Sequence, residues 1–171
     1  LKNAEMRIEP ELKHTFRANE KTLVGSITVM PFIKHHDAAE PVSFVVEHDG
    51  IKIGVFTDIG KVCKTVIHYF RQCHACFLES NYDLQMLEEG GYPLHLKKRI
   101  SGGKGHLSNS EALELFLKYK PPYMSHLLLS QLSANNNHPS IVEELFTKHS
   151  GNVNIIVAPR TGPTAVYKVE R

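Results

Sequence analysis

The chain contains the run Lys34-His35-His36-Asp37-Ala38-Ala39-Glu40-Pro41-Val42-Ser43-Phe44 and, further on, the run Val55-Phe56-Thr57-Asp58-Ile59-Gly60. Each run places a polar side chain, His36 or Asp58, where an apolar strand is expected to give way to a turn. In layered α/β proteins, site residues collect at the ends of strands. A neutral imidazole and a carboxylate together suit zinc or manganese. The two runs therefore predict a metal site.

Size and composition favour one ordinary globular domain. The chain has 171 residues and a formal net charge of +2 with neutral histidines, so it lacks the global basic field that marks a nucleic-acid binder by charge alone. No run approaches the ~18 apolar residues of a membrane span, and no signal-peptide pattern is present. We expect no membrane association and a cytoplasmic protein. The first residue is Leu1, not an initiator Met, which suggests a piece of something longer.

The cysteines favour the same compartment. Cys63, Cys73 and Cys76 are odd in number and fall in apolar periodic segments, which is typical of reduced, buried thiols in a cytosolic protein. Cys73 and Cys76 form a Cys-x-x-Cys without a second such pair. A thiolate metal cage is therefore not indicated.

The order of elements predicts an α/β fold. Asp49-Gly50 is a strong signal for a two-residue hairpin turn between strands over 44–48 and 51–56. Apolar positions then share one helical face over 62–70, and a short buried strand follows over 75–78. Strand, helix and strand in succession are the α/β signature.

The remaining segments continue the α/β pattern. Residues 1–18 read as a loose lead-in before an extended segment that starts at Ile27. We expect further helices over 84–87, after Tyr92-Pro93, from Ser108 or Asn109 through 113–119, and after Pro139. Further strands are expected over 126–130, 154–158 and 165–169.

Polar groups follow several of these elements. They are His36, Asp58, residues 79–83, His106 in a glycine-rich loop, and residues 131–137. Loops at one edge of a packed sheet can bring such groups together. Taken alone, each has a plainer interpretation, such as a structural histidine, a turn-stabilising aspartate or a capping asparagine.

Five motifs occur in one order along the chain: His-Asp-Ala-x-Glu-Pro-Val-x-Phe (36–44), Thr-Asp-x-Gly (57–60), Leu-Glu-Ser-Asn-x-Asp (78–83), Tyr-Pro-x-x-Leu-Lys-x-Arg-Ile followed by Gly-His-Leu-Ser-Asn (92–109), and Leu-Ser-x-Leu-Ser-x-x-Asn-Asn (129–137). Together they resemble the metallo-β-lactamase-fold hydrolases, in particular the WalJ/YycJ-like branch, which is similar to RNase Z and to cyclic phosphodiesterases. The resemblance covers most of residues 20–171 and the C-terminal part of that family. It implies the C-terminal portion of an αββα sandwich, with a mixed, largely antiparallel sheet and flanking helices.

The resemblance implies roles for five residues. His36 matches the family's metal-ligand histidine, and Asp58 matches the carboxylate that bridges two metals. His106 matches the RNase Z histidine over the scissile phosphate, and Glu79 matches its glutamate partner. Gln131 stands where relatives usually have a histidine ligand, and an amide is a poorer zinc ligand than an imidazole. Nearby Lys97, Lys98, Arg99, Lys104 and Asn109 are candidates for binding a polyanionic substrate, with a solvated basic face as the alternative for the four cations.

The family's signature His-x-His-x-Asp-His, which supplies most metal ligands, is absent from this sequence. Either the chain is the C-terminal portion of a longer protein, completed by an N-terminal half of the same domain, or it is a naturally reduced half. We expect the former, with a two-metal Zn²⁺ or Mn²⁺ site completed by that motif.

Two functions remain open. The first is a metal-dependent hydrolase, a phosphodiesterase or nuclease such as a DNA exonuclease, which acts on nucleic acid or another phosphodiester, is inactive as this fragment alone and is compatible with a homo-oligomer. The second is a metal-free scaffold or partner-binding protein, which the missing signature and Gln131 would favour.

Overall fold

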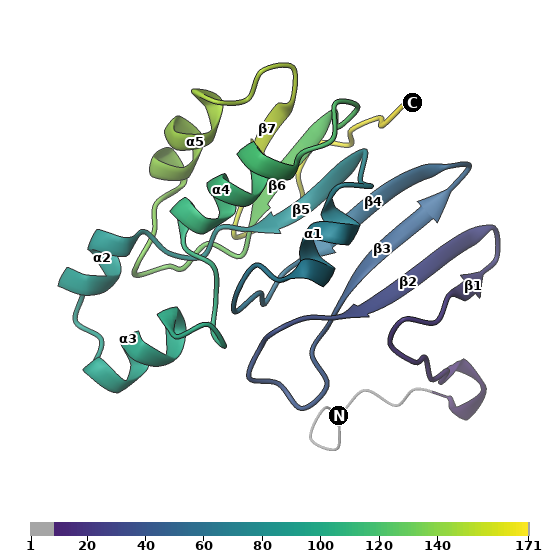
Figure 1. Cartoon of the computed structure of the whole chain (residues 1–171), viewed down its shortest axis with the longest axis horizontal. Helices are drawn as coiled ribbons and strands as arrows, with labels where there is room; N and C mark the ends of the chain where they lie inside the picture. Colours follow the sequence, from purple (N-terminus) through teal and green to yellow (C-terminus); the bar gives the residue numbers. More distant parts are fainter. Residues whose placement is uncertain (1–8, 171) are drawn as a thin grey trace.

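A computed structural model describes residues 9–170 of the chain. Seven strands form one sheet whose spatial order follows the chain order, and helices lie against one of its faces (Figure 1). In chain order the elements are η1 (Pro10–Leu12), β1 (Thr22–Val24), β2 (Ile27–Ile33), β3 (Val42–His48), β4 (Ile51–Phe56), α1 (Lys64–Phe70), β5 (Ala75–Glu79), α2 (Leu84–Glu89), α3 (Leu94–Ser101), α4 (Asn109–Tyr119), β6 (His126–Ser130), α5 (Pro139–Thr147) and β7 (Asn154–Val157).

The first half of the sheet is antiparallel. The predicted hairpin is confirmed, because β3 pairs with β4 and His48 faces Ile51 across the turn. Asp49 and Gly50 have φ angles of 49° and 77°, and a two-residue hairpin turn of this kind needs positive φ at both positions. The short strand β1 before β2 is not predicted by the sequence pattern.

The second half of the sheet is parallel. Strands β4, β5, β6 and β7 pair in parallel, and helices lie in the connections between them. Parallel pairs equal antiparallel pairs in number, at three each among the described strands. The sheet is thus mixed as expected, but it is less dominated by antiparallel pairs than the hairpin signals indicate, because each helical connection returns the chain to a parallel strand.

The core lies between the sheet and helices α1, α4 and α5. Phe32, Phe56 and Leu78 from the sheet are fully buried in one cluster with residues of these helices. The opposite face of the sheet carries Phe44, Val55 and Phe77, which stand in register and are only half-buried.

Helix α4 begins with a capping box. Ser108 Oγ accepts a hydrogen bond from the Glu111 amide, and the Glu111 carboxylate accepts one from the Ser108 amide. The two bonds satisfy donors that a helix start otherwise leaves unpaired. The box also fixes the chain two residues after His106.

Replacing Ser108 by alanine is expected to lower the free energy of unfolding by about 0.5–2 kcal/mol, because it removes the cap. Urea denaturation of the wild-type and variant proteins measures this difference. Glu114→Ala in the same helix is the control, since its exposed ion pair with Lys118 contributes at most about 0.5 kcal/mol. Equal losses in the two variants would contradict a capping role.

The predicted strand over 165–169 is wrong. These residues have no strand partner, and Val166 is fully exposed. The segment is rich in residues that favour strands, but strand propensity depends on a pairing and packing surface. The segment approaches the sheet at Tyr167, whose ring centroid lies 5.6 Å from that of His126 in β6.

None of the helices in the described part of the chain has the length and apolar character that a bilayer crossing requires.

Candidate functional site

One edge of the sheet gathers the loops that carry the predicted site residues. Strands β4, β5 and β6 run in parallel, so the loops after Phe56, Glu79 and Ser130 leave at the same edge. Strand β2 runs in the same direction, because two antiparallel pairings separate it from β4. His36 therefore reaches the edge that also carries Asp58 and Gln131.

Asp58 lies at the centre of this edge in a turn with φ of 52°. Its Oδ1 atom is 4.0 Å from His36 Nε2 and 3.9 Å from His106 Nδ1. The side chain is 41% exposed, so solvent and a ligand can reach it. The structure thus brings together the three residues predicted from separate motifs.

The His36 ring is oriented by the glycine loop. Its Nδ1 atom lies 2.8 Å from the carbonyl oxygen of Gly105. A carbonyl oxygen only accepts, so this contact places the proton on Nδ1 and leaves Nε2 with a free lone pair. Nε2 is the atom that faces Asp58 and also lies 3.4 Å from Asp37 Oδ1. A histidine held at one nitrogen by a backbone carbonyl is a common arrangement for a metal ligand.

Glu79 and His106 form a buried pair. Glu79 is fully buried, and its two oxygens accept hydrogen bonds from His106 Nδ1 and from the Ile59 amide, each at 2.6 Å. Burial raises the pKa of the Glu79 carboxyl, and the hydrogen bond to His106 opposes that shift. The same hydrogen bond raises the pKa of His106. The pair therefore retains a proton on the side of His106 that faces Glu79.

Interatomic distances show which two side chains could bind the same ion and which two are instead hydrogen-bonded to each other. Bonds of about 2.0–2.2 Å to one ion leave ligand atoms about 3–4.2 Å apart, and the 4.0 Å from His36 Nε2 to Asp58 Oδ1 lies in that range. Donor atoms of Asp58, Glu79 and His106 also cluster within 4.8 Å of one another. The 2.6 Å between Glu79 and His106 is too short for two ligands of one ion. The donor set thus fits a divalent cation at His36 and Asp58.

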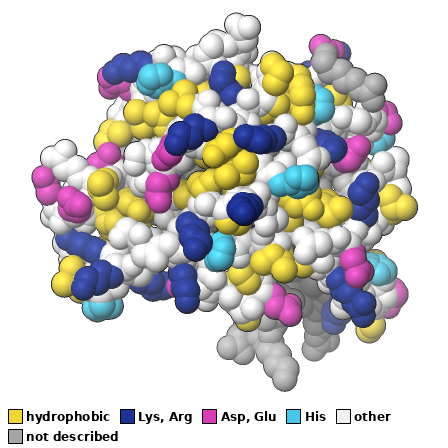
Figure 2. All heavy atoms as spheres, in the orientation of Figure 1, with side chains coloured by type: hydrophobic (Ala, Val, Ile, Leu, Met, Phe, Trp, Pro, Cys, Tyr) yellow, Lys and Arg dark blue, Asp and Glu magenta, His cyan; other side chains and the backbone are white. Residues whose placement is uncertain are grey.

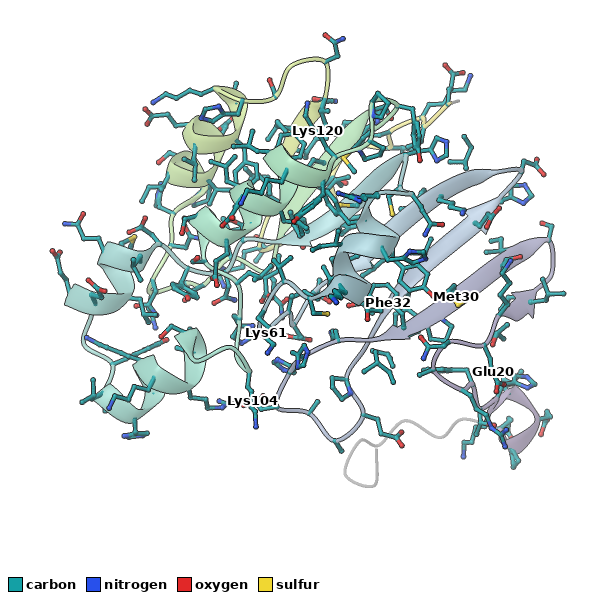
Figure 3. All side chains as sticks on the ribbon, in the orientation of Figure 1. Glu20, Met30, Phe32, Lys61, Lys104 and Lys120 are labelled. Atoms are coloured by element: carbon teal, nitrogen blue, oxygen red, sulfur yellow. The ribbon has the colours of Figure 1, made fainter. Side chains whose placement is uncertain are left out.

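The glycine loop lies directly against the Asp58 turn. A side chain on Gly60 would meet the Lys104 Cα atom at 2.6 Å, so only glycine permits this approach. Lys61 and Lys104 lie near each other beside this contact, between α1 and α3 (Figure 3).

Lys34 is a site residue that the sequence analysis does not single out. It is 7% exposed, and its Nζ atom donates a hydrogen bond to the Thr57 carbonyl, next to Asp58. Burial lowers the pKa of Lys34, while the charges of Asp58 and Glu79 oppose this shift. From the sequence, a charged side chain followed by two histidines is expected at the surface. The buried position of Lys34 follows only from the tertiary structure.

The predicted substrate-binding residues divide into two groups. Lys97 Nζ donates to the Glu88 carbonyl oxygen at 2.6 Å, and Arg99 Nε donates to Asp37 Oδ2 at 2.6 Å. The bond to Arg99 lowers the pKa of Asp37. Arg99 and Lys104 are exposed, whereas Lys97 is half-buried. Figure 2 shows lysine and arginine side chains gathered over the middle of the helix-covered face.

Asn109 differs from these cations because it is buried. Its Oδ1 atom accepts from Ser80 Oγ at 2.7 Å and from Asn137 Nδ2 at 2.8 Å, and its Nδ2 atom donates to Asn137 Oδ1 at 3.0 Å. The side chain is 3% exposed and has its polar atoms engaged. This network ties together the loops after β5, before α4 and after β6, so Asn109 supports the site and does not face a substrate.

A groove of about 1290 Å³ opens beside His106 and Gln131. Its wall combines apolar and basic residues of α3, the loop after β6 and the segment around β7, among them Leu96, Arg99 and Arg160. A groove with this lining can accept a chain that carries both flat apolar groups and negative charge.

Comparison with known proteins gives relatives of one kind. No family model matches the chain. Exodeoxyribonuclease YycJ of Bacillus anthracis is 32% identical over 130 residues, which are 76% of this chain and 49% of that protein. Exodeoxyribonuclease WalJ of Streptococcus pneumoniae serotype 2 is 27% identical over 163 residues, which are 95% of this chain and 58% of that protein. The chain thus spans about half the length of the curated relatives it matches.

Solved structures agree on the fold. The metallo-β-lactamase-fold protein YhfI from Bacillus subtilis aligns with a TM-score of 0.62 and 17% identity, over 84% of this chain and 52% of that one. Zn²⁺-bound PqqB from Methylobacterium extorquens aligns with a TM-score of 0.59 and 14% identity, over 84% of this chain and 50% of that one. The α/β fold expected from the resemblance is confirmed.

Proposed function

We propose that this chain, which has the metallo-β-lactamase fold and is similar to the exodeoxyribonucleases YycJ and WalJ, forms part of the active site of a metal-dependent phosphodiesterase that degrades DNA as an exonuclease. The observation that carries the proposal is the approach of His36 Nε2 and His106 Nδ1 to the same Asp58 oxygen, at 4.0 and 3.9 Å. The side chains of His36 and Asp58 and the ring of His106 thus surround one small volume.

His36 and Asp58 would hold a divalent ion, zinc or manganese, because an imidazole and a carboxylate suit both metals. Such an ion supplies hydroxide near neutral pH and withdraws charge from a phosphoryl oxygen. A catalytic zinc usually takes three protein ligands. We therefore propose that a His-x-His-x-Asp-His motif outside this chain, in the same domain, completes a metal centre.

His106 would act on the leaving oxygen of the scissile phosphodiester. As the P–O bond breaks, charge develops on that oxygen, and an imidazolium can donate a proton to it. Glu79 fixes the ring through Nδ1, so that Nε2 is the nitrogen left to face the substrate. The buried carboxylate also stabilises the positive charge on the ring before the proton is transferred.

The exposed cations would hold the flanking phosphates. Arg99 lies in α3, just before the glycine loop that carries His106, and Lys104 lies within that loop. Phosphate groups on a polyanion attract such side chains. We assign the same role to Arg160 in the neighbouring groove. Buried thiols at Cys73 and Cys76 without disulfide partners support a cytoplasmic protein.

The proposal is tested with a protein that also contains the proposed His-x-His-x-Asp-His segment, which we call the natural-length protein. The assay is hydrolysis of an end-labelled DNA strand. We expect nucleotides to be released from the end, the reaction to stop with a chelator, and added Mn²⁺ or Zn²⁺ to restore it. The alternative function, a metal-free scaffold, is favoured by the Gln131 amide, which hydrogen-bonds Asp58 where the relatives usually have a histidine ligand. Absence of both bound metal and hydrolysis would support the scaffold, and hydrolysis that survives the chelator and His36→Ala would refute the proposed mechanism.

A further inference from the structure

Gln131 and Asp58 hold each other by a reciprocal pair of hydrogen bonds. The Asp58 amide donates to Gln131 Oε1 at 2.9 Å, and Gln131 Nε2 donates to Asp58 Oδ1. Both residues leave their strands with positive φ angles, 52° and 60°. Asn81 Nδ2 further donates to the Gln131 carbonyl oxygen at 2.7 Å, so the Gln131 backbone is fixed as well.

These bonds determine which way the Gln131 carboxamide points. A backbone amide can only donate, so the oxygen of the side chain must face the Asp58 N–H. The amino group must then face the Asp58 carboxylate. In the opposite orientation two donors would oppose each other, and the carboxylate would oppose an oxygen.

The Gln131 amino group is therefore a hydrogen-bond donor at the point where a second metal ion would need a ligand. Asp58 Oδ1 is the oxygen that lies 4.0 Å from His36 Nε2 and 3.9 Å from His106 Nδ1. A carboxylate that joins two ions uses lone pairs toward both of them, and Gln131 Nε2 already occupies one of those directions. An amide nitrogen with two hydrogens has no lone pair to offer a cation.

We propose that Gln131 limits this centre to one divalent ion per chain, because it places an amino group, which has no lone pair to offer, where a second ion beside Asp58 would need a ligand. The proposal rests on the proposed metal-dependent function and deepens it. It makes residue 131 the position that sets the number of ions.

The substitution Gln131→Glu tests the idea with almost no change in shape. It replaces the donor with a carboxylate oxygen, so two carboxylates face each other, and a cation between them relieves the repulsion. Gln131→Met is the matched control, because it retains the length of the side chain but supplies neither the donor nor an oxygen ligand.

Equilibrium dialysis of the natural-length protein against Mn²⁺ or Zn²⁺, followed by elemental analysis, measures the ions bound per chain. We expect about one ion in the wild type and the Gln131→Met variant, and about two in Gln131→Glu, a two-fold rise toward a two-metal centre. Asp58→Asn identifies the ions that belong to this centre, and thermal melting verifies that each variant is folded.

Two ions per wild-type chain, both lost with Asp58→Asn, would overturn the limit but leave the metal-dependent function standing. An unchanged count in folded Gln131→Glu would also overturn it. A wild-type protein that binds no ion sensitive to Asp58→Asn would overturn both the limit and the proposed function.

Discussion

Replacing Asp58 by asparagine is expected to weaken divalent metal binding by at least about 100-fold and to abolish phosphodiester hydrolysis. Loss of a group that only supports a ligand already costs 10–100-fold, and Asp58 supplies the charge itself. The asparagine retains an oxygen that can accept from Gln131 Nε2, so the turn is preserved. Isothermal titration with Mn²⁺ and a DNA hydrolysis assay measure the two effects.

Asp49→Asn is the matched control for that experiment. Asp49 undergoes the same chemical change and also has a positive φ, 49° against 52° for Asp58, but it lies in the β3–β4 turn at the opposite ends of these strands. We expect its metal affinity and activity to equal those of the wild type. Equal behaviour of Asp58→Asn and Asp49→Asn would contradict the role of Asp58 in the metal centre.

Replacing His106 by alanine is expected to lower kcat on DNA by about 10²–10⁴-fold, because in the proposed reaction the leaving oxygen would lose its proton donor. The number of bound metal ions should not change, since Asp58 and His36 remain. The nitrophenolate group of a nitrophenyl phosphodiester leaves readily without being protonated. Hydrolysis of that ester should therefore be much less affected by His106→Ala. The ratio of the two rates therefore separates proton donation from structural damage.

His35→Ala serves as the control for His106→Ala. His35 is exposed, and its contact with the site is through its backbone carbonyl, which accepts from the Gly60 amide at 2.6 Å and is retained in alanine. We expect no change with either substrate. An equal loss on DNA and on the nitrophenyl ester in His106→Ala would argue against general acid catalysis.

The sequence predicts the fold well where local signals are strong. The Asp49-Gly50 turn, the helix faces and the apolar strands 126–130 and 154–157 depend on neighbouring residues, and the structure reproduces them. The segment 165–169 fails because its apolar residues favour a strand, but a strand also needs a neighbour to pair with. Local propensity cannot supply that information.

The candidate site could be anticipated only in part. Strand order explains why His36, Asp58, Glu79 and Gln131 reach one edge of the sheet. His106 was placed with them only by the resemblance of its motif to a known family. Contacts between loops were not predictable. Arg99 pairs with Asp37 across 62 positions of sequence, and the buried position of Lys34 depends on the turn at Thr57. Such contacts follow from the packing of whole elements, which no short sequence pattern encodes.

The most direct test of this account is anomalous diffraction from crystals of the natural-length protein grown with zinc. We expect a zinc peak within about 2.0–2.2 Å of both His36 Nε2 and an Asp58 carboxylate oxygen, with the Glu79–His106 hydrogen bond intact beside it. A protein that binds zinc elsewhere, with no peak between His36 and Asp58, would contradict the central claim that these two side chains hold the metal.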